Sequence, residues 1–205
     1  MGDAVDLFSQ SSQAVLVDSL KANDVDVLVV ETFATGEIDF TEHLTRVKES
    51  NPDAIFISAL SPEVTAILMQ GRRLGIPADI PFIVTVTLTS EQIQLAGDAA
   101  EGAISFTSWV GTADIPRNQA FVQNFNDKYG MQPNLFAAQA YAAVYVLVEA
   151  IANAQSTDST AIRDELAKTK NLDTVLGKFT FDIDGDAVYA PTVLIVKNGK
   201  LEVFG

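Results

Sequence analysis

Short apolar runs alternate with helical patterns through the first half of the chain, and this alternation constrains the fold more than any other feature. Four runs are rich in β-branched and aromatic residues: residues 25–30, 54–58, 81–86 and 103–107. Near-continuous apolar runs of this length are typical of parallel strands covered on both faces. Amphipathic helical patterns separate them, for example over residues 40–47. The sequence therefore predicts an α/β fold with a doubly wound, mostly parallel sheet.

The C-terminal half has longer helical patterns. Residues 134–154 form the most apolar segment, which Gln139 and Glu149 interrupt. The segment is long enough to span a membrane but lacks basic flanks, so a buried helix is favoured and we expect no membrane span. The chain then becomes β-like, and Asn198-Gly199 predicts a tight hairpin turn.

Composition argues against several classes of function. The 205 residues include 27 Asp and Glu but 13 Lys and Arg, which gives a net charge of −14. This charge repels phosphate backbones and anionic membrane surfaces, so we expect no nucleic-acid partner. The chain has no cysteine, which excludes disulfides, thiolate metal sites and cysteine nucleophiles. Because neither a Gly-rich phosphate loop nor a nucleophile–base set is apparent, we expect neither an enzyme nor a cofactor.

Two features of the sequence contain residue types that bind metal ions, His43 and the acidic residues of 182–186. His43 is the only histidine and lies in a helical pattern, where we expect it to face solvent. The acidic residues of 182–186 resemble the start of a calcium loop, but such a loop needs Gly and Glu where this chain has Ala187 and Val193. We therefore expect a hairpin turn at residues 182–186 and no bound metal.

One segment carries a family resemblance. Residues 98–102, Asp-Ala-Ala-Glu-Gly, followed by Ser-Phe-Thr-Ser at 105–108, resemble a segment of branched-chain amino acid ABC-transporter substrate-binding proteins. Other similar segments occur in family order over essentially the whole chain: residues 31–40, 51–56, 139–145 and 181–186. The resemblance implies a type I periplasmic-binding fold, in which two α/β lobes joined by hinge crossovers close on a small solute. It also implies an ABC permease as partner of the intact protein, and a periplasmic or extracellular location after removal of a signal peptide.

The resemblance implies how the chain divides. Residues 1–114 correspond to the second-lobe ligand-binding domain, residues 115–190 to helices and a hairpin strand of a partial first lobe, and residues 191–205 to a C-terminal hairpin that crosses back. By this comparison most of the first lobe is missing. So is the opening strand of the second lobe, which belongs at the centre of its sheet between the runs at 25–30 and 54–58.

In open parallel sheets, ligands bind beyond the carboxyl ends of the strands. The candidate ligand-binding residues in the loops there are Phe8, Ser9, Ser58, Leu60, Thr85, Val86 and Trp109. The resemblance implies that an aromatic side chain at Phe8 packs on the solute. For Trp109, lining of the cleft and packing at the hinge both remain open.

The resemblance also bears on the charge of the solute. In the amino-acid binders of the family, an aromatic near Leu60 and a carboxylate near Val86 hold the ligand's ammonium. Both positions are apolar here, and an unpaired ammonium in a closed cleft is costly. Among small amino acid-like solutes, amides and organic or aromatic acids, we therefore expect an uncharged or anionic one.

Two interpretations of function follow from these features. The first is the solute-binding component of an ABC importer, and the alternative is a solute-sensing receptor or regulatory domain of the same fold. With half of the cleft missing, we expect this chain to bind its solute weakly or not at all. The apolar helix 134–154 also lacks its usual covering surface, so we expect homo-oligomers that form through it.

Overall fold

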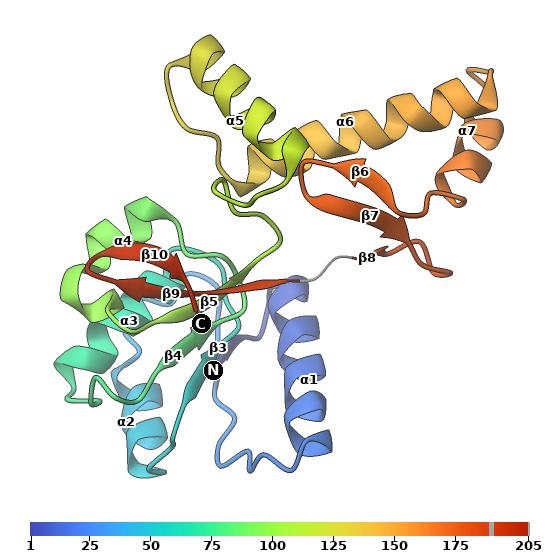
Figure 1. Cartoon of the computed structure of the whole chain (residues 1–205). Helices are drawn as coiled ribbons and strands as arrows, with labels where there is room; N and C mark the ends of the chain where they lie inside the picture. The colour runs from blue at the N-terminus through green and yellow to red at the C-terminus, as the bar shows by residue number, and fades with distance from the viewer. Residues whose placement is uncertain (189–190, 205) are drawn as a thin grey trace. The chain divides into compact units, whose positions relative to one another are not determined.

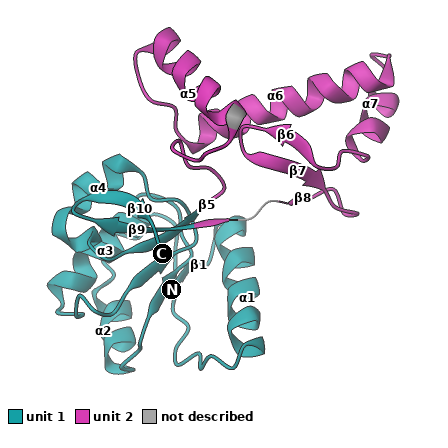
Figure 2. Cartoon of the chain, viewed as in Figure 1, with its two compact units in different colours: residues 1–106, 193–205 teal, residues 107–192 magenta. Residues whose placement is uncertain are grey.

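Two units, each with its own sheet, make up the chain (Figure 2). The computed structural model describes residues 1–188 and 191–204. The units comprise residues 1–106 with 193–205, and residues 107–192. The predicted boundary between residues 190 and 191 adjoins residues 189–190, which lie outside the described residues.

The first unit alternates strands and helices in chain order (Figure 1). Its elements are β1 (Gly2–Asp3), α1 (Leu7–Ala22), β2 (Thr32–Phe33), α2 (Thr41–Glu49), β3 (Ile55–Ile57), α3 (Glu63–Arg73), β4 (Phe82–Val84), α4 (Ser90–Ala96), the 3₁₀ helix η1 (Gly97–Ala100), β5 (Ile104–Thr107), β9 (Thr192–Lys197) and β10 (Lys200–Val203). The second unit contains α5 (Pro116–Tyr129), α6 (Leu135–Ala154), α7 (Ser159–Leu166), β6 (Leu172–Thr174), β7 (Gly177–Phe181) and β8 (Ala187–Val188).

The main sheet of the first unit has the strand order β10-β9-β5-β4-β3. Strands β3, β4 and β5 are parallel, with Ile55 opposite Phe82 and Ile83 opposite Ile104. These strands confirm the predictions for residues 54–58, 81–86 and 103–107. Next to β3, the short strands β1 and β2 pair in parallel, and Gly2 forms a bridge to Ser58 that links β1 to β3.

The expected strand over residues 25–30 is wrong. These residues have no regular secondary structure, and β1 pairs with β2 on this side instead of with residues 25–30. Within the described chain, the one backbone hydrogen bond from this stretch to another residue runs from the amide of Val25 back to Leu20. A β-strand exists only where a neighbouring backbone completes its ladder. The run has the composition of a strand but no partner over this length.

The core of the first unit lies between its sheet and its helices. Leu44 and Val47 of α2 are buried, as are Ile67 and Leu68 of α3. They join one apolar cluster with strand residues such as Phe82. Burial of each of these side chains contributes about 1.5–3 kcal/mol relative to exposure, which explains why the helical stripes face the sheet.

Two turns match their sequence signals. Asn198 and Gly199 have φ angles of 51° and 70°, as the two central residues of a tight hairpin turn require, and β9 and β10 pair around them. The predicted hairpin turn at 182–186 is also confirmed, because β7 and β8 pair in antiparallel around it. The carboxylate of Asp182 accepts the backbone N–H groups of Asp184 and Asp186 at 3.0 and 2.8 Å.

The second unit is built on the long helix α6. The Asn134 side chain caps its start by accepting the backbone N–H of Ala137. Its buried stripe consists of small residues at helical spacing: Ala138, Ala142, Val146 and Ala150. The opposite stripe is apolar but exposed, with Phe136 68%, Val144 62% and Val148 58% accessible.

Candidate functional site

The carboxyl ends of β1, β3 and β4 bring three predicted site residues to one edge of the first unit. The Ser58 hydroxyl donates to the carbonyl of Ser9 at 2.9 Å. The amide of Asp3 donates to the carbonyl of Ser58, and the amide of Thr85 donates to that of Ile57. Ser9, Ser58 and Thr85 therefore meet where ligands of open parallel sheets bind.

Two large apolar side chains stand exposed after these strands. Phe8 lies in the first turn of α1, which begins where the Asp6 carboxylate accepts the amide of Ser9 at 2.7 Å. Phe8 is 49% exposed, and Leu60, which follows β3, is 45% exposed. Exposed apolar side chains that follow neighbouring strands can pack on a solute with an apolar body.

Two hydroxyl groups at this edge are buried without a partner. Ser9 Oγ and Thr85 Oγ1 make no hydrogen bond to any described residue. Buried polar groups are nearly always hydrogen-bonded, and an unpaired one costs about 1–3 kcal/mol. Both belong to predicted site residues, and both can donate to or accept from a group that enters the edge.

The buried carboxylates in this region already have partners. Asp3 accepts hydrogen bonds from the Thr35 hydroxyl at 2.7 Å and from the amides of Val5 and Asp6. Burial raises the pKa of Asp3, but these donors outweigh it, so the pKa lies below its ordinary value. Glu63 accepts the amide of Gly36 at 2.9 Å.

The loop after β4 presents no carboxylate at its start. Val86 is half-buried and packs against the main core. Glu91 is exposed in the first turn of α4. The start of α4 is instead fixed by a capping box, in which Thr89 Oγ1 accepts the amide of Gln92 and Gln92 Oε1 accepts the amide of Thr89.

Trp109 belongs to the second unit. Its indole Nε1 donates to Asn118 Oδ1 at 2.6 Å, and its ring meets Phe121 edge-on at 6.2 Å between centroids. Asn118 is fully buried and donates in turn to the carbonyls of Val110, Gly111 and Ala113. The structure therefore gives Trp109 a fixed packing place within the second unit, and the other six candidates lie in the first unit.

The expectation that His43 faces solvent is wrong. Its side chain is 16% exposed, with Nδ1 2.7 Å from Glu31 Oε2 and Nε2 3.0 Å from Glu37 Oε1. Arg46 donates to both oxygens of Glu31 at 2.9 and 2.7 Å. The hydrogen bond from Arg46, followed by that from His43, lowers the pKa of Glu31 to about 2 against the opposing effect of burial. Within the described residues, no group of three or more acidic, histidine or cysteine side chains is arranged to hold a metal ion.

Comparisons with known proteins agree with this architecture. The family of periplasmic binding proteins matches residues 2–200. A Leu/Ile/Val-binding protein homolog of Brucella abortus is 30% identical over 174 residues, which cover 82% of this chain and 46% of that protein. The Leu/Ile/Val-binding protein of Escherichia coli is 29% identical over 172 residues, 82% of this chain and 45% of that protein.

Solved structures show the same similarity. A leucine binding protein, LivK, from Thermotoga maritima superposes with a TM-score of 0.92 at 30% identity, covering all of this chain and 58% of that one. The substrate-binding protein LivJ of Streptococcus pneumoniae, solved with isoleucine, gives a TM-score of 0.84 at 27% identity over 98% of this chain and 57% of that one.

The chain belongs to the family of periplasmic binding proteins. Its fold is that of the type I periplasmic-binding proteins. The chain spans about half the length of the curated relatives it matches.

Proposed function

We propose that the chain forms part of the solute-binding component of an ABC importer, in the periplasm or outside the cell. The solute binds at the edge of the first unit made by Phe8, Ser9, Ser58, Leu60, Thr85 and Val86. Closure of two lobes on the solute then produces the form that the permease recognises. The observation that carries this proposal is the meeting of two exposed apolar side chains and two unpaired hydroxyls at the carboxyl edge of the parallel strands.

The same edge supports an uncharged or anionic solute. The relatives are named for leucine, isoleucine and valine, each of which carries an ammonium group. Here the buried carboxylates Asp3 and Glu63 already accept hydrogen bonds, and Val86 stands where the family resemblance places a carboxylate. A small branched or aromatic acid, or its amide, fits hydroxyl donors and apolar walls without leaving an ammonium unpaired.

An NMR titration of the ¹⁵N-labelled chain tests this preference, because it reports solute contacts at individual amides over a wide range of affinities. We expect 4-methylpentanoate and its amide to shift the amide signals of Ser9 and Thr85 more than leucine does. Phe8→Ala weakens the response, whereas Val15→Ala, an exposed change on the same helix, leaves it intact. A clear preference for leucine overturns the choice of solute class.

A variant that gains leucine binding gives a second test of the argument that this edge lacks a carboxylate for the solute's ammonium group. Val86→Glu supplies the missing carboxylate, so we expect it to increase the leucine response. Val86→Gln is the matched control, because it has the same shape without the charge. An equal response of both variants to leucine contradicts the assignment of Val86 as the position that decides the solute's charge.

We also propose that α6 is not a membrane span and that its exposed stripe drives self-association. The helix is apolar, with a mean hydropathy of 1.7, and its 20 residues are long enough to cross a membrane. However, its inner stripe already packs within the second unit, and Phe136, Val144 and Val148 remain exposed. Apolar side chains on one helix face favour association with a second copy.

Size-exclusion chromatography with light scattering measures this association. We expect dimers or larger species without detergent, and a shift toward monomer for Val144→Glu with Val148→Glu. The control is Ile183→Glu, which changes a residue 98% exposed in the β7–β8 turn. A monodisperse monomer of the unchanged chain disproves the proposal.

A further inference from the structure

The turn between β9 and β10 contains the one Asn-Gly pair of the sequence, Asn198-Gly199. Lys197 and Lys200 pair across it, so the loop has two residues, and their φ angles of 51° and 70° define a type I′ turn. Both loop residues are exposed, and β10 is the outermost strand of the main sheet (Figure 1). The pair is therefore open to water.

An asparagine that precedes glycine can react with the backbone of its own chain. The Gly199 nitrogen gives up its proton and attacks Cγ of Asn198. The bond from Cγ to the side-chain nitrogen breaks, and ammonia leaves with that proton. The resulting five-membered succinimide ring then adds water at one of its two carbonyls, which gives aspartate or isoaspartate. Glycine favours the attack because no Cβ shields its nitrogen.

The turn holds the two reacting atoms apart. In a type I′ turn the first central residue has a ψ angle of about 30°, which places the Gly199 nitrogen nearly opposite to Cβ of Asn198. Ring closure requires this nitrogen to eclipse Cβ instead. The peptide plane between the two residues must therefore rotate by more than a right angle, and the Gly199 N–H group then leaves its place in the turn.

A carboxylate from a distant part of the sequence binds the turn in this conformation. Glu101 Oε1 accepts the amide of Asn198 at 2.9 Å, and Oε2 accepts the amide of Gly199 at 3.3 Å. Glu101 lies between η1 and β5, and the next residue, Gly102, donates to the carbonyl of Val196 in β9 at 3.0 Å. Hydrogen bonds to a charged acceptor are stronger than neutral ones. Rotation of the Asn198–Gly199 peptide therefore breaks a strong hydrogen bond as well as the turn.

Reaction at this turn changes the edge of the main sheet. Isoaspartate adds one atom to the backbone between Lys197 and Lys200, which breaks their register and that of Val196 with Leu201. Either product also adds a carboxylate next to that of Glu101. Val196 is fully buried and Leu201 packs against the main core, so the loss of register weakens the packing of this edge.

We propose that Asn198 is a site of slow deamidation, and that Glu101 sets its rate by holding the turn in the unreactive conformation. The modification is spontaneous and does not depend on solute binding. While Glu101 holds both amides, the hairpin keeps its register. Once residue 198 becomes isoaspartate, β10 separates from β9.

The test follows residue 198 by mass spectrometry in the 205-residue chain, kept at mildly alkaline pH. Peptide mapping measures the conversion of Asn198, and electron-transfer fragmentation distinguishes aspartate from isoaspartate. The reference is a synthetic peptide of residues 194–203, which lacks Glu101. We expect conversion in the folded chain to be at least about tenfold slower than in the peptide, and to match the peptide when urea unfolds the chain. Equal rates in the folded chain and the peptide overturn the proposal.

Glu101→Ala isolates the role of the carboxylate. Glu202→Ala is the matched control, because Glu202 is an exposed glutamate of β10 and its replacement makes the same change of net charge. We expect Glu101→Ala to speed conversion about tenfold and Glu202→Ala to leave the rate unchanged. Equal rates in the two variants overturn the proposal. A slower reaction in Glu101→Ala also overturns it, because Glu101 then acts as a base for the attack.

Circular dichroism shows whether each variant remains folded. If Glu101→Ala unfolds, Glu101→Gln replaces it, because the glutamine side chain keeps one acceptor oxygen and the shape of glutamate. We expect this variant to convert at a rate between those of the wild type and the peptide. A rate equal to that of the wild type contradicts the role of the charge.

The product gives an independent measurement. Ion exchange separates the deamidated chain, because it carries one more negative charge. We expect the isoaspartate form to have a lower urea midpoint and faster amide exchange at Glu202, which pairs with Ile195 across the hairpin. A product with the stability and the Glu202 exchange of the unmodified chain contradicts the loss of register.

Discussion

Replacement of Glu31 by Gln should destabilise the first unit in a pH-dependent manner. Glu31 lies on the segment before β2, and its carboxylate binds Arg46 and His43 of α2. The Glu31 side chain is 11% exposed. Glu31→Gln keeps the shape of the side chain but removes the charge that holds these two basic side chains.

The size of the effect follows from the pKa. Arg46, then His43, lowers the pKa of Glu31 from 4.5 to about 2. At about 1.4 kcal/mol per pKa unit, the full shift corresponds to about 3 kcal/mol. Because the Arg46 side chain is 48% exposed, solvent and salt screen the pair, and we expect about 1–2 kcal/mol at neutral pH. A lowered carboxyl pKa stabilises the fold fully above about pH 4.5, and this stabilisation is lost as the pH falls toward 2.

Urea unfolding followed by circular dichroism measures the difference between the wild type and Glu31→Gln. The matched control is Glu42→Gln, because Glu42 is 90% exposed and lies 3.8 Å from Arg46. We expect less than about 0.5 kcal/mol for this control. The reasoning is refuted if Glu31→Gln costs no more than Glu42→Gln, or if its cost at about pH 2 equals its cost at neutral pH.

Two further substitutions test packing inside each unit separately, Asn118→Ala in the second unit and Gly71→Ala in the first. Asn118→Ala removes the acceptor of the Trp109 indole and the donor to three carbonyls, so we expect a loss of about 2–3 kcal/mol in urea unfolding and a red-shifted emission of the chain's only tryptophan. An unchanged emission maximum contradicts this. Gly71→Ala places a Cβ 2.5 Å from Cζ of Phe82, so we expect a loss of about 1–3 kcal/mol in thermal unfolding, although alanine favours a helix interior by about 0.5–1 kcal/mol. A raised melting temperature would show that the Phe82 ring moves aside.

The parts of the fold with local signals could be predicted from the sequence. The runs at 54–58, 81–86 and 103–107 are apolar enough to be covered on both faces, and each becomes a strand with a neighbour. Asn198-Gly199 specifies its turn because both residues tolerate positive φ angles. Such signals lie within a few residues of one another, so they can be recognised from the sequence alone.

Features made by distant residues could not be predicted in this way. His43 appears as an isolated polar residue on α2, and its two carboxylate partners come from the segment around β2. The unpaired hydroxyls of Ser9 and Thr85 depend on which backbone groups surround them in the folded chain. The sequence placed both residues at the candidate site, but it could not show that their hydroxyls are buried without partners.

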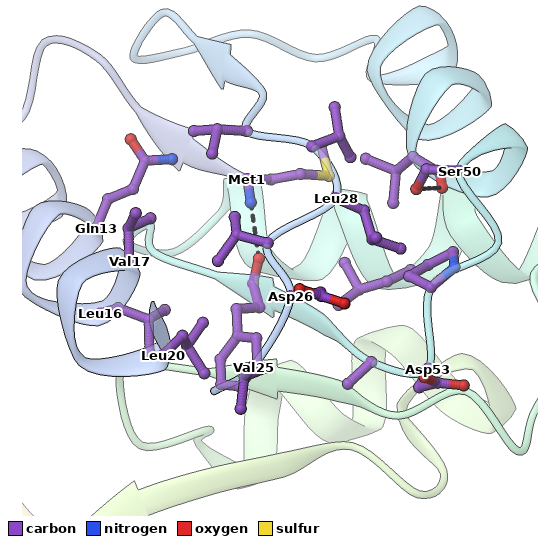
Figure 3. Close-up of a pocket in the computed structure, with 18 of the residues that line it drawn as sticks. Met1, Gln13, Leu16, Val17, Leu20, Val25, Asp26, Leu28, Ser50 and Asp53 are labelled. Carbon is purple, nitrogen blue, oxygen red and sulfur yellow. Dashed lines mark hydrogen bonds between the residues drawn. The ribbon is translucent and has the colours of Figure 1, made fainter. Parts of the chain in front are cut away.

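The run at 25–30 combines both cases. Its near-continuous apolar residues favour a strand, but a strand also needs a neighbouring backbone, and these residues line a groove instead (Figure 3). The run is partly buried, because Val29 packs against the main core whereas Val30 is 50% exposed. Composition therefore indicates which runs can become strands, whereas the presence of a neighbouring backbone decides which of them do.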